Sequence, residues 1–140
     1  MADNLTSEQR RRTMAAVKST GPRLEQKFRE SFLPREDLDL EANATDLYGR
    51  PDFVHRDARL AIFLDSCFWH GCKEHLRMPA SNVEYWHRKI QRNRRRDRQV
   101  TAYLKKDGWQ VLRIWEHSLK KPRALKWWLT RIGSLIAERT

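Results

Sequence analysis

The only two cysteines of the chain lie close together in the stretch DSCFWHGCKEH, residues 65–75. Cys67, Cys72 and His75 are separated by four and then two residues, so three metal-type ligands fall within nine positions. Structural zinc takes four sulfur or nitrogen ligands in a tetrahedron, so a fourth must come from elsewhere. His117 is the best candidate, because a strand ending at Trp115 would deliver it rigidly. The remaining histidines are His55, His70 and His87.

The alternative for Cys67 and Cys72 is a pair of free thiols buried in the core. A disulfide would suit a secreted protein, but residues 1–14 hold no apolar signal run. No segment approaches the ~20 apolar residues of a membrane span. We therefore expect a cytoplasmic protein with no membrane partner, and metal ligation is the better interpretation of the cysteines.

Two carboxylates lie near the two ends of the segment 51–65, which has the pattern of a β-hairpin. Asp52 begins one strand, and Asp65 follows the continuously apolar run 60–64, thirteen residues later. A hairpin can bring such residues together, and paired carboxylate oxygens suit Mg²⁺. The alternative is that each acid only ends its strand.

A long helix predicted at 81–106 carries a third acid on its apolar stripe. The stripe advances in steps of three and four residues through Val83, Trp86, Ile90, Asn93, Asp97, Val100 and Leu104. A buried carboxylate costs several kcal/mol unless it is paired. Asp97 therefore needs a partner, which is either an arginine or His70. A histidine oriented by a carboxylate is a competent general base.

Basic residues dominate the chain, whose formal net charge is +11 and whose pI is about 10.3. This balance favours a nucleic-acid partner, bound in a salt-dependent way. The predicted long helix carries Arg88, Lys89, Arg92, Arg94, Arg95, Arg96 and Arg98, and a predicted N-terminal helix carries Arg10, Arg11, Arg12 and Lys18. A charge run is otherwise a solvated helix face.

Aromatic side chains lie between the predicted zinc ligands. A tight surface loop cannot turn both Phe68 and Trp69 into the core, so we expect them to stack on bases or to wedge between base pairs. Trp86 either joins them or belongs to the core.

The helices and strands that would position these residues are predicted to form one α/β domain over the 140 residues, with helices packed on a small sheet. Helices are predicted at 7–19, 22–33, 81–106 and 122–136, with a hairpin at 51–65, a strand at 109–115 and a short strand near Leu40. Capping boxes at Thr6/Gln9 and Ser81/Glu84 would begin two of the helices, and Gly108 would end the long one. We expect a monomer.

Several separated motifs together resemble the very short patch repair (Vsr) family of DNA mismatch endonucleases. They are GRPDFV (49–54), CFWHGC (67–72), EYWHRKIQRNRRRD (84–97), GWQVLRIWEH (108–117) and RRTMAAV (11–17) with Glu25. The resemblance covers nearly the whole chain. It implies a restriction-endonuclease-like fold, a PD-(D/E)xK-type variant with an added structural Zn²⁺ site, and an N-terminal DNA-contacting helix at 1–20. The implied activity is Mg²⁺-dependent nicking of double-stranded DNA, 5′ to the thymine of a T:G mismatch left by deaminated 5-methylcytosine.

The resemblance also implies site residues and partners. Asp52 would be the central Mg²⁺ ligand, supported by Glu25 and Asp65, and His70 would activate water with help from Asp97. The implied zinc ligands are Cys67, Cys72, His75 and His117, and the implied DNA contacts are Met14, Phe68, Trp69, Trp86, Lys89 and Asn93. The implied partners are mismatch-repair proteins such as MutL and a repair polymerase. The implied location is the nucleoid of a bacterium or archaeon.

One departure concerns the lysine that restriction-type sites carry two residues after the second acid. Ser66 and Cys67 follow Asp65 here, so this lysine is missing, and the resemblance implies that His70 replaces it. Two rival functions remain open: a related nickase or restriction-type enzyme in phage defence, and a non-catalytic, zinc-stabilised DNA-binding protein. RNA binding is a more distant alternative.

Overall fold

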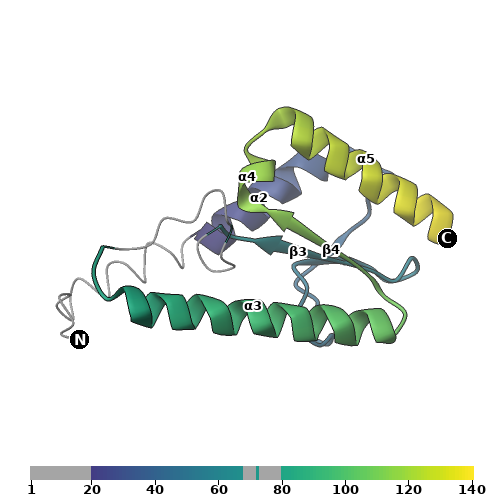
Figure 1. Cartoon of the computed structure of the whole chain (residues 1–140). Coiled ribbons are helices and arrows are strands. Elements are labelled where there is room, and N and C mark those ends of the chain that lie inside the picture. Colours follow the sequence, from purple (N-terminus) through teal and green to yellow (C-terminus); the bar gives the residue numbers. More distant parts are fainter. Residues whose placement is uncertain (1–19, 68–71, 73–79) are drawn as a thin grey trace.

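The computed structural model of the chain describes residues 20–67, 72 and 80–140, apart from the side chains of 20–22. Within these ranges a small sheet lies between helices (Figure 1). The helices are α2 (Thr20–Phe32), α3 (Val83–Lys106), α4 (Glu116–Leu119) and α5 (Pro122–Arg139). The strands are β1 (Glu41–Ala42), β2 (Phe53–His55), β3 (Leu60–Asp65) and β4 (Gln110–Trp115). The predicted N-terminal helix and Met14 lie outside the described residues.

The four strands are ordered β1-β2-β3-β4, so the apolar β3 lies inside the sheet. It pairs antiparallel with β2, which confirms the hairpin, and parallel with β4. Every residue of β3 is buried, as a continuous apolar run in a central strand requires. The short strand expected near Leu40 is β1, which pairs with β2.

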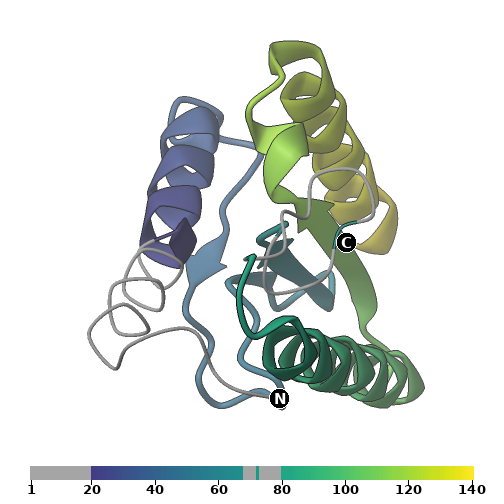
Figure 2. The same cartoon turned by 60° about the vertical axis from the view of Figure 1, so that its left-hand side comes forward.

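The two faces of the sheet bury separate apolar clusters, because side chains alternate along each strand. Leu60, Ile62 and Leu64 of β3 pack against α2, α4 and α5. Ala61 and Phe63 face the other way, toward Val100 and Leu104 of α3. Of the described helices, α3 alone lies on its side of the sheet, and α2 and α5 lie on the opposite side (Figures 1 and 2). The mixed α/β architecture predicted from the sequence is thus confirmed.

The ends of α3 only partly follow the sequence prediction. The N-cap residue is Asn82, with φ of 59° and no side-chain capping bond, so the capping box at Ser81 and Glu84 is wrong. Val83 is 44% exposed, so the inward stripe begins only at Trp86. The C-terminal prediction is confirmed, because Gly108 takes a φ of 89°, the left-handed conformation that suits glycine after a helix.

The amphipathic faces of the two other long helices are as predicted. Leu24, Phe28 and Phe32 of α2 are buried. Leu129 and Ile132 lead the buried face of α5. Within the parts of the chain that the structure describes, no helix combines the length and apolarity needed to span a bilayer.

Candidate active site and metal centre

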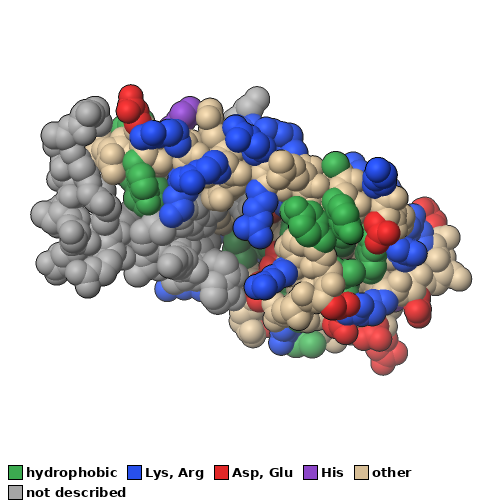
Figure 3. Space-filling model, turned by 90° about the horizontal axis from the view of Figure 1, so that it is seen from below, with side chains coloured by type: hydrophobic (Ala, Val, Ile, Leu, Met, Phe, Trp, Pro, Cys, Tyr) green, Lys and Arg blue, Asp and Glu red, His purple; other side chains and the backbone are tan. Residues whose placement is uncertain are grey.

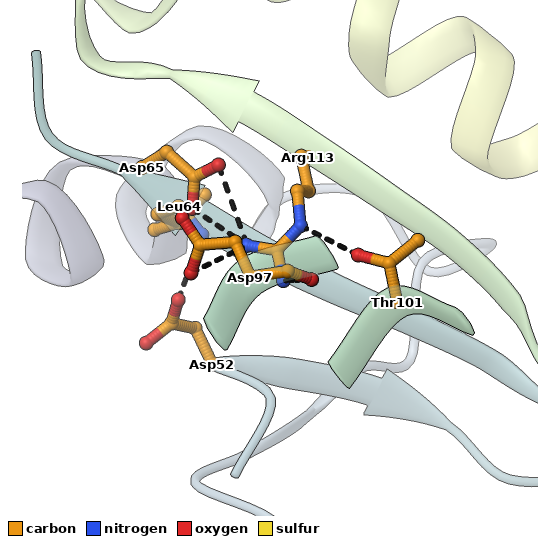
Figure 4. Close-up of polar contacts among 6 residues, drawn as sticks. All are labelled: Asp52, Leu64, Asp65, Asp97, Thr101 and Arg113. Atoms are coloured by element: carbon orange, nitrogen blue, oxygen red, sulfur yellow. Dashed lines mark hydrogen bonds and ion pairs between the residues drawn. The ribbon is translucent and has the colours of Figure 1, made fainter. Parts of the chain in front are cut away.

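A cleft of about 300 Å³ opens between the sheet and α3. Its acidic and amide side chains are Asp52, Asp65, Asn93 and Asp97, which come from the segment before β2, from the end of β3 and from α3. Figure 4 shows Asp65 and Asp97 against the guanidinium of Arg113 on β4, and Asp52 hydrogen-bonded to the backbone of Leu64. The other lining residues are Gly49, Arg50, Phe63, Leu64, Arg96 and Val100. The structure therefore confirms that Asp52 and Asp65 are brought together and that Asn93 and Asp97 face inward.

Strand alternation explains why these groups face the same way. Phe53 belongs to the α2/α5 core, so its neighbour Asp52 points to the α3 side. Asp65 continues the α3-facing series that includes Phe63. Arg113 lies in register with Phe63 on the parallel strand β4, and therefore shares that face.

A tight turn holds the segment that delivers Asp52. Gly49 and Arg50 both take left-handed backbone conformations, with φ of 82° and 51°. A Cβ on Gly49 would collide with the side chain of Val100 on α3. Glycine is therefore required for both the backbone conformation and the close approach to the helix.

Asp52 is anchored and electrostatically perturbed. The backbone amide of Leu64 donates a 2.7 Å hydrogen bond to its Oδ2. Burial is the main cause that raises its pKa to about 7, and a side-chain hydrogen bond with Glu25 and the charges of Glu25 and Asp65 act in the same direction. A carboxyl with a pKa near neutrality is typical of a functional site. Glu25, predicted to support Asp52, is thus its neighbour.

Asp97 does have a cationic partner, and it is an arginine. Arg113 Nη1 lies 3.6 Å from Asp97 Oδ1 and 3.1 Å from Asp65 Oδ1. An arginine is therefore one partner of Asp97. His70, the other candidate partner, lies outside the described residues.

Cys67, Cys72 and His117 form a second cluster at the end of β3 and β4. His117 Nδ1 lies 3.5 Å from the Cys67 sulfur and 3.6 Å from the Cys72 sulfur. Among the described residues, these three form the one set of metal-type ligands whose atoms all lie within 4.8 Å of one another. Tetrahedral zinc would separate a nitrogen and a sulfur ligand by about 3.6 Å, so the cluster fits a metal ion.

The surroundings of the cluster favour a closed site. Both sulfurs belong to buried residues, and burial raises the pKa of the Cys67 thiol to about 11. The amide of Cys67 donates to Glu116 Oε1 at 3.0 Å, and the amide of Cys72 donates to the Cys67 carbonyl at 3.0 Å. The cluster can hold a metal only if the thiols lose their protons, so binding would release protons.

Of the other histidines, only His55 and His87 belong to the described residues. His55 accepts a hydrogen bond from the amide of Ala58 at 3.1 Å, and His87 contacts Gln91 on the exposed side of α3. Neither belongs to the cluster, and His117 is the described histidine that lies beside the two thiols, where the sequence predicted it. His70 and His75, like Phe68 and Trp69, lie outside the described residues.

The outward face of α3 is basic. Arg88, Arg92, Arg94, Arg95, Arg96 and Arg98 are all exposed. Figure 3 shows Lys and Arg side chains spread over α3, with acidic side chains gathered mainly toward one end of the molecule. Lys89 lies over the ring of Tyr85, 5.8 Å from its centroid. Trp86 is fully buried, so a wedge role would require the residues that cover it to move.

Arg113 is the cleft residue that the sequence prediction missed. It lies in the apolar strand QVLRIW, in phase with Val111, which packs against the α3 side of the sheet. A charged residue at an inward phase of a strand needs a buried partner, as Asp97 does on the facing helix. The two periodicities therefore each mark a charged residue that needs a buried partner, but neither identifies that partner.

Comparison with known proteins gives this geometry a family context. The family model described as DNA mismatch endonuclease Vsr matches residues 2–75. The DNA mismatch endonuclease Vsr of Escherichia coli (strain K12) is 36% identical over 121 residues, 86% of this chain and 77% of that protein. Type II nicking enzyme V.NmeDIP of Neisseria meningitidis serogroup C is 38% identical over 121 residues, 85% of this chain and 81% of that protein. Type II nicking enzyme V.NaeI of Lentzea aerocolonigenes is 40% identical over 103 residues, 74% of this chain, which span 58% of that longer protein.

Proposed function

This chain belongs to the Vsr family of DNA mismatch endonucleases, and from that premise we propose that it nicks double-stranded DNA 5′ to the thymine of a T:G mismatch. It is an endonuclease that acts on DNA. The observation that carries the proposal is the carboxylate cleft, which lies directly beside the exposed arginines of α3. A cleft of this kind accepts a phosphate at its mouth and a hard cation at its base.

The donor set of the cleft fits Mg²⁺. Asp52 offers a carboxylate held by Leu64, and Glu25 and Asp65 are close enough to raise its pKa. Oxygen ligands of this kind, completed by water, are what Mg²⁺ prefers. When bound there, the ion would polarise the scissile phosphate and stabilise the leaving oxygen. Asp52 must be ionised to serve as the ligand, so it must lose the proton that its surroundings favour.

Activation of water is assigned to His70, with Asp97 as the group that orients it. Asp97 lies on the cleft wall, where Arg113 holds its carboxylate and also bonds its backbone carbonyl. A carboxylate fixed in this way can orient an imidazole, which then takes the proton from the attacking water.

Binding to DNA would rest on two kinds of contact. The exposed arginines of α3 would neutralise phosphates and so make affinity fall steeply with salt. Phe68 and Trp69 would wedge into the poorly stacked mismatch, while Met14, Lys89 and Asn93 would approach the grooves and the mismatched pair. Replacing Trp69 with alanine should cost about 1–3 kcal/mol of binding. Unchanged T:G selectivity in that variant would remove the wedge from the proposal.

The Cys67–Cys72–His117 cluster is proposed to hold structural Zn²⁺, with His75 as the fourth ligand. Its two sulfur donors are soft, unlike the carboxylate oxygens of the cleft, and both cysteines are buried. The ion would cross-link the end of β3 to α4, and so fix the segment that carries the wedge residues and His70.

The decisive experiment compares nicking of otherwise identical T:G and C:G duplexes with Mg²⁺, using the wild type and Asp52→Asn. We expect a nick 5′ to the thymine in the T:G duplex alone, lost in Asp52→Asn. Asparagine keeps the size and an oxygen that can accept from Leu64, so it tests the charge rather than the fold.

A second candidate is a nickase of another target. It is favoured by the relatives that are named type II nicking enzymes. Equal rates on matched and mismatched duplexes would support it. Mg²⁺-independent binding with no nicking at all would instead support a non-catalytic DNA-binding protein.

A further inference from the structure

Arg113 is the group around which the cleft wall is organised. Its side chain is 21% exposed and extends from β4 between β3 and α3. Nη1 approaches Asp65 Oδ1 at 3.1 Å and Asp97 Oδ1 at 3.6 Å. The guanidinium carbon lies 4.3 Å from the centroid of the Phe63 ring.

The other donors of Arg113 bind the backbone and side chains of α3. Nη2 donates to the Asp97 carbonyl at 3.1 Å, and Nε donates to Thr101 Oγ1 at 2.9 Å. A planar guanidinium with several donors fixed at once holds its partners in one geometry, which a flexible ammonium cannot do. Arg113 therefore ties two strands and a helix together at the cleft.

Asp65 is the most buried of these acids, at 4% exposure. An anion at this depth must be compensated, and Arg113 reaches both of its oxygens, at 3.1 and 3.4 Å. The chain lacks a lysine two residues after Asp65, and Arg113 supplies a cation from the neighbouring strand instead.

From these contacts we propose that Arg113 is a positioning residue for the reaction, and that Asp65 acts as its counter-ion rather than as a Mg²⁺ ligand. Arg113 holds Asp65 and Asp97 on the cleft wall and leaves Asp52 as the metal-binding carboxylate. The inference rests on the proposed nuclease function and assigns a task to a residue within the same cleft.

This role separates turnover from DNA affinity. The charge of Arg113 faces two carboxylates, and its donors bind groups of the protein, so it adds little attraction for phosphate. Its loss should displace Asp97 relative to the reacting atoms, and a displacement of about 1 Å can cost about 100-fold in rate. Replacing the exposed arginines of α3 should instead weaken DNA binding and leave kcat nearly unchanged, because these side chains face solvent.

The first test measures nicking by Arg113→Met, Arg113→Lys and the control Arg35→Met. Arg35 pairs with Asp37 at 2.9 Å on an exposed surface, so its variant loses the same charge and one ion pair. We expect kcat of Arg113→Met to fall about 100-fold with KM for DNA within about twofold, partial recovery in Arg113→Lys, and wild-type rates for Arg35→Met. A folded Arg113→Met with wild-type kcat, or one that changes KM alone, would overturn the positioning role.

Removal of Arg113 could unfold the chain, because Asp65 would remain buried without this cation. The double variant Asp65→Asn/Arg113→Met removes both charges and so keeps the positioning role testable. Low kcat in the folded double variant supports the proposal, whereas wild-type kcat overturns it.

The second test does not depend on nicking. Mg²⁺ alone is titrated into the ¹⁵N-labelled protein, and the amide signal of Leu64 is followed, because this amide donates to Asp52. We expect Asp65→Asn to keep the apparent Mg²⁺ affinity within about twofold, and Asp52→Asn to lose it. Equal losses in both variants would make Asp65 a ligand and overturn the counter-ion assignment. A wild type that binds Mg²⁺ but nicks no duplex would instead sink the proposed function.

Discussion

The carboxylate cleft and the Cys/His cluster are neighbours in the chain and opposites in chemistry. Asp65 lines the cleft, and Cys67, two residues later, belongs to the cluster. The cleft holds three aspartates, and burial, together with the charges of Glu25 and Asp65, raises the pKa of Asp52 to about 7. The cluster offers two buried sulfurs and one nitrogen.

The contrast follows from what each site has to do. A reacting site must admit a phosphate, water and a hard cation, and it must tolerate like charges before they arrive. A structural metal site only has to hold its ligands, so it can be small, soft and closed. Four changes separate these two tasks experimentally.

The largest expected effect is that of Asp52→Asn on nicking. Loss of the metal-binding charge should lower kcat by about 10³-fold or more, because phosphodiester cleavage depends chiefly on stabilising the charge that develops in the transition state. The thermal midpoint should stay at or above that of the wild type at neutral pH. A rate loss that tracks a loss of folded protein would show that the substitution acts on the fold.

Loss of the cluster, unlike Asp52→Asn, should lower the stability of the fold. Cys67→Ser, or prolonged chelation of the wild type, should lower stability by several kcal/mol, equivalent to a midpoint about 10–20 °C lower. Bound metal measured by elemental analysis should fall in parallel. His87→Ala is the matched control, since His87 lies outside the cluster. Equal midpoints with and without chelator would contradict a structural metal.

The raised pKa of Asp52, about 7, predicts how the stability of the Mg²⁺-free protein depends on pH. Between the unfolded value of about 3.9 and about 7, the native state binds more protons than the unfolded chain, so stability falls as pH rises. The fall should amount to about 1–3 kcal/mol, and this contribution should be flat above pH 7. Urea unfolding across this range checks it, and Asp52→Asn should lack that part of the slope.

An effect of similar size concerns the turn before Asp52. Gly49→Ala should destabilise the fold by about 1–3 kcal/mol, because alanine disfavours positive φ and its Cβ would meet Val100. Gly133→Ala is the contrasting control, since Gly133 lies within α5 and has no positive φ. Denaturant midpoints compare the two, and a larger loss for Gly133→Ala would mean that the turn is not the constraint.

Much of the fold could be predicted because its signals are local. The apolar run in β3 and the stripes on α2 and α5 encode their elements directly. The start of α3 was mispredicted, because Ser81 matches a capping pattern while the chain enters the helix through a left-handed Asn82. A side-chain capping pattern does not specify the backbone path before the helix.

The candidate site was predictable where one residue breaks a pattern. Asp97 interrupts an apolar stripe, so its need for a partner could be foreseen, but the partner could not. Arg113 lies 16 residues away on another element, and only the parallel pairing of β3 with β4 brings it to the cleft. The raised pKa of Asp52 likewise depends on Glu25, which tertiary packing alone brings near.

The parallel register of β3 and β4 also limits how this chain can change in length. Asp65 pairs with Trp115, and the cluster residues Cys67 and His117 each lie two positions further on. One inserted residue within either strand would turn the following side chains to the opposite face and separate sulfur from imidazole. An insertion in the turn between β2 and β3 would leave this matched spacing intact. Evolution or engineering can therefore lengthen the hairpin, but the two paired strands have to keep their length.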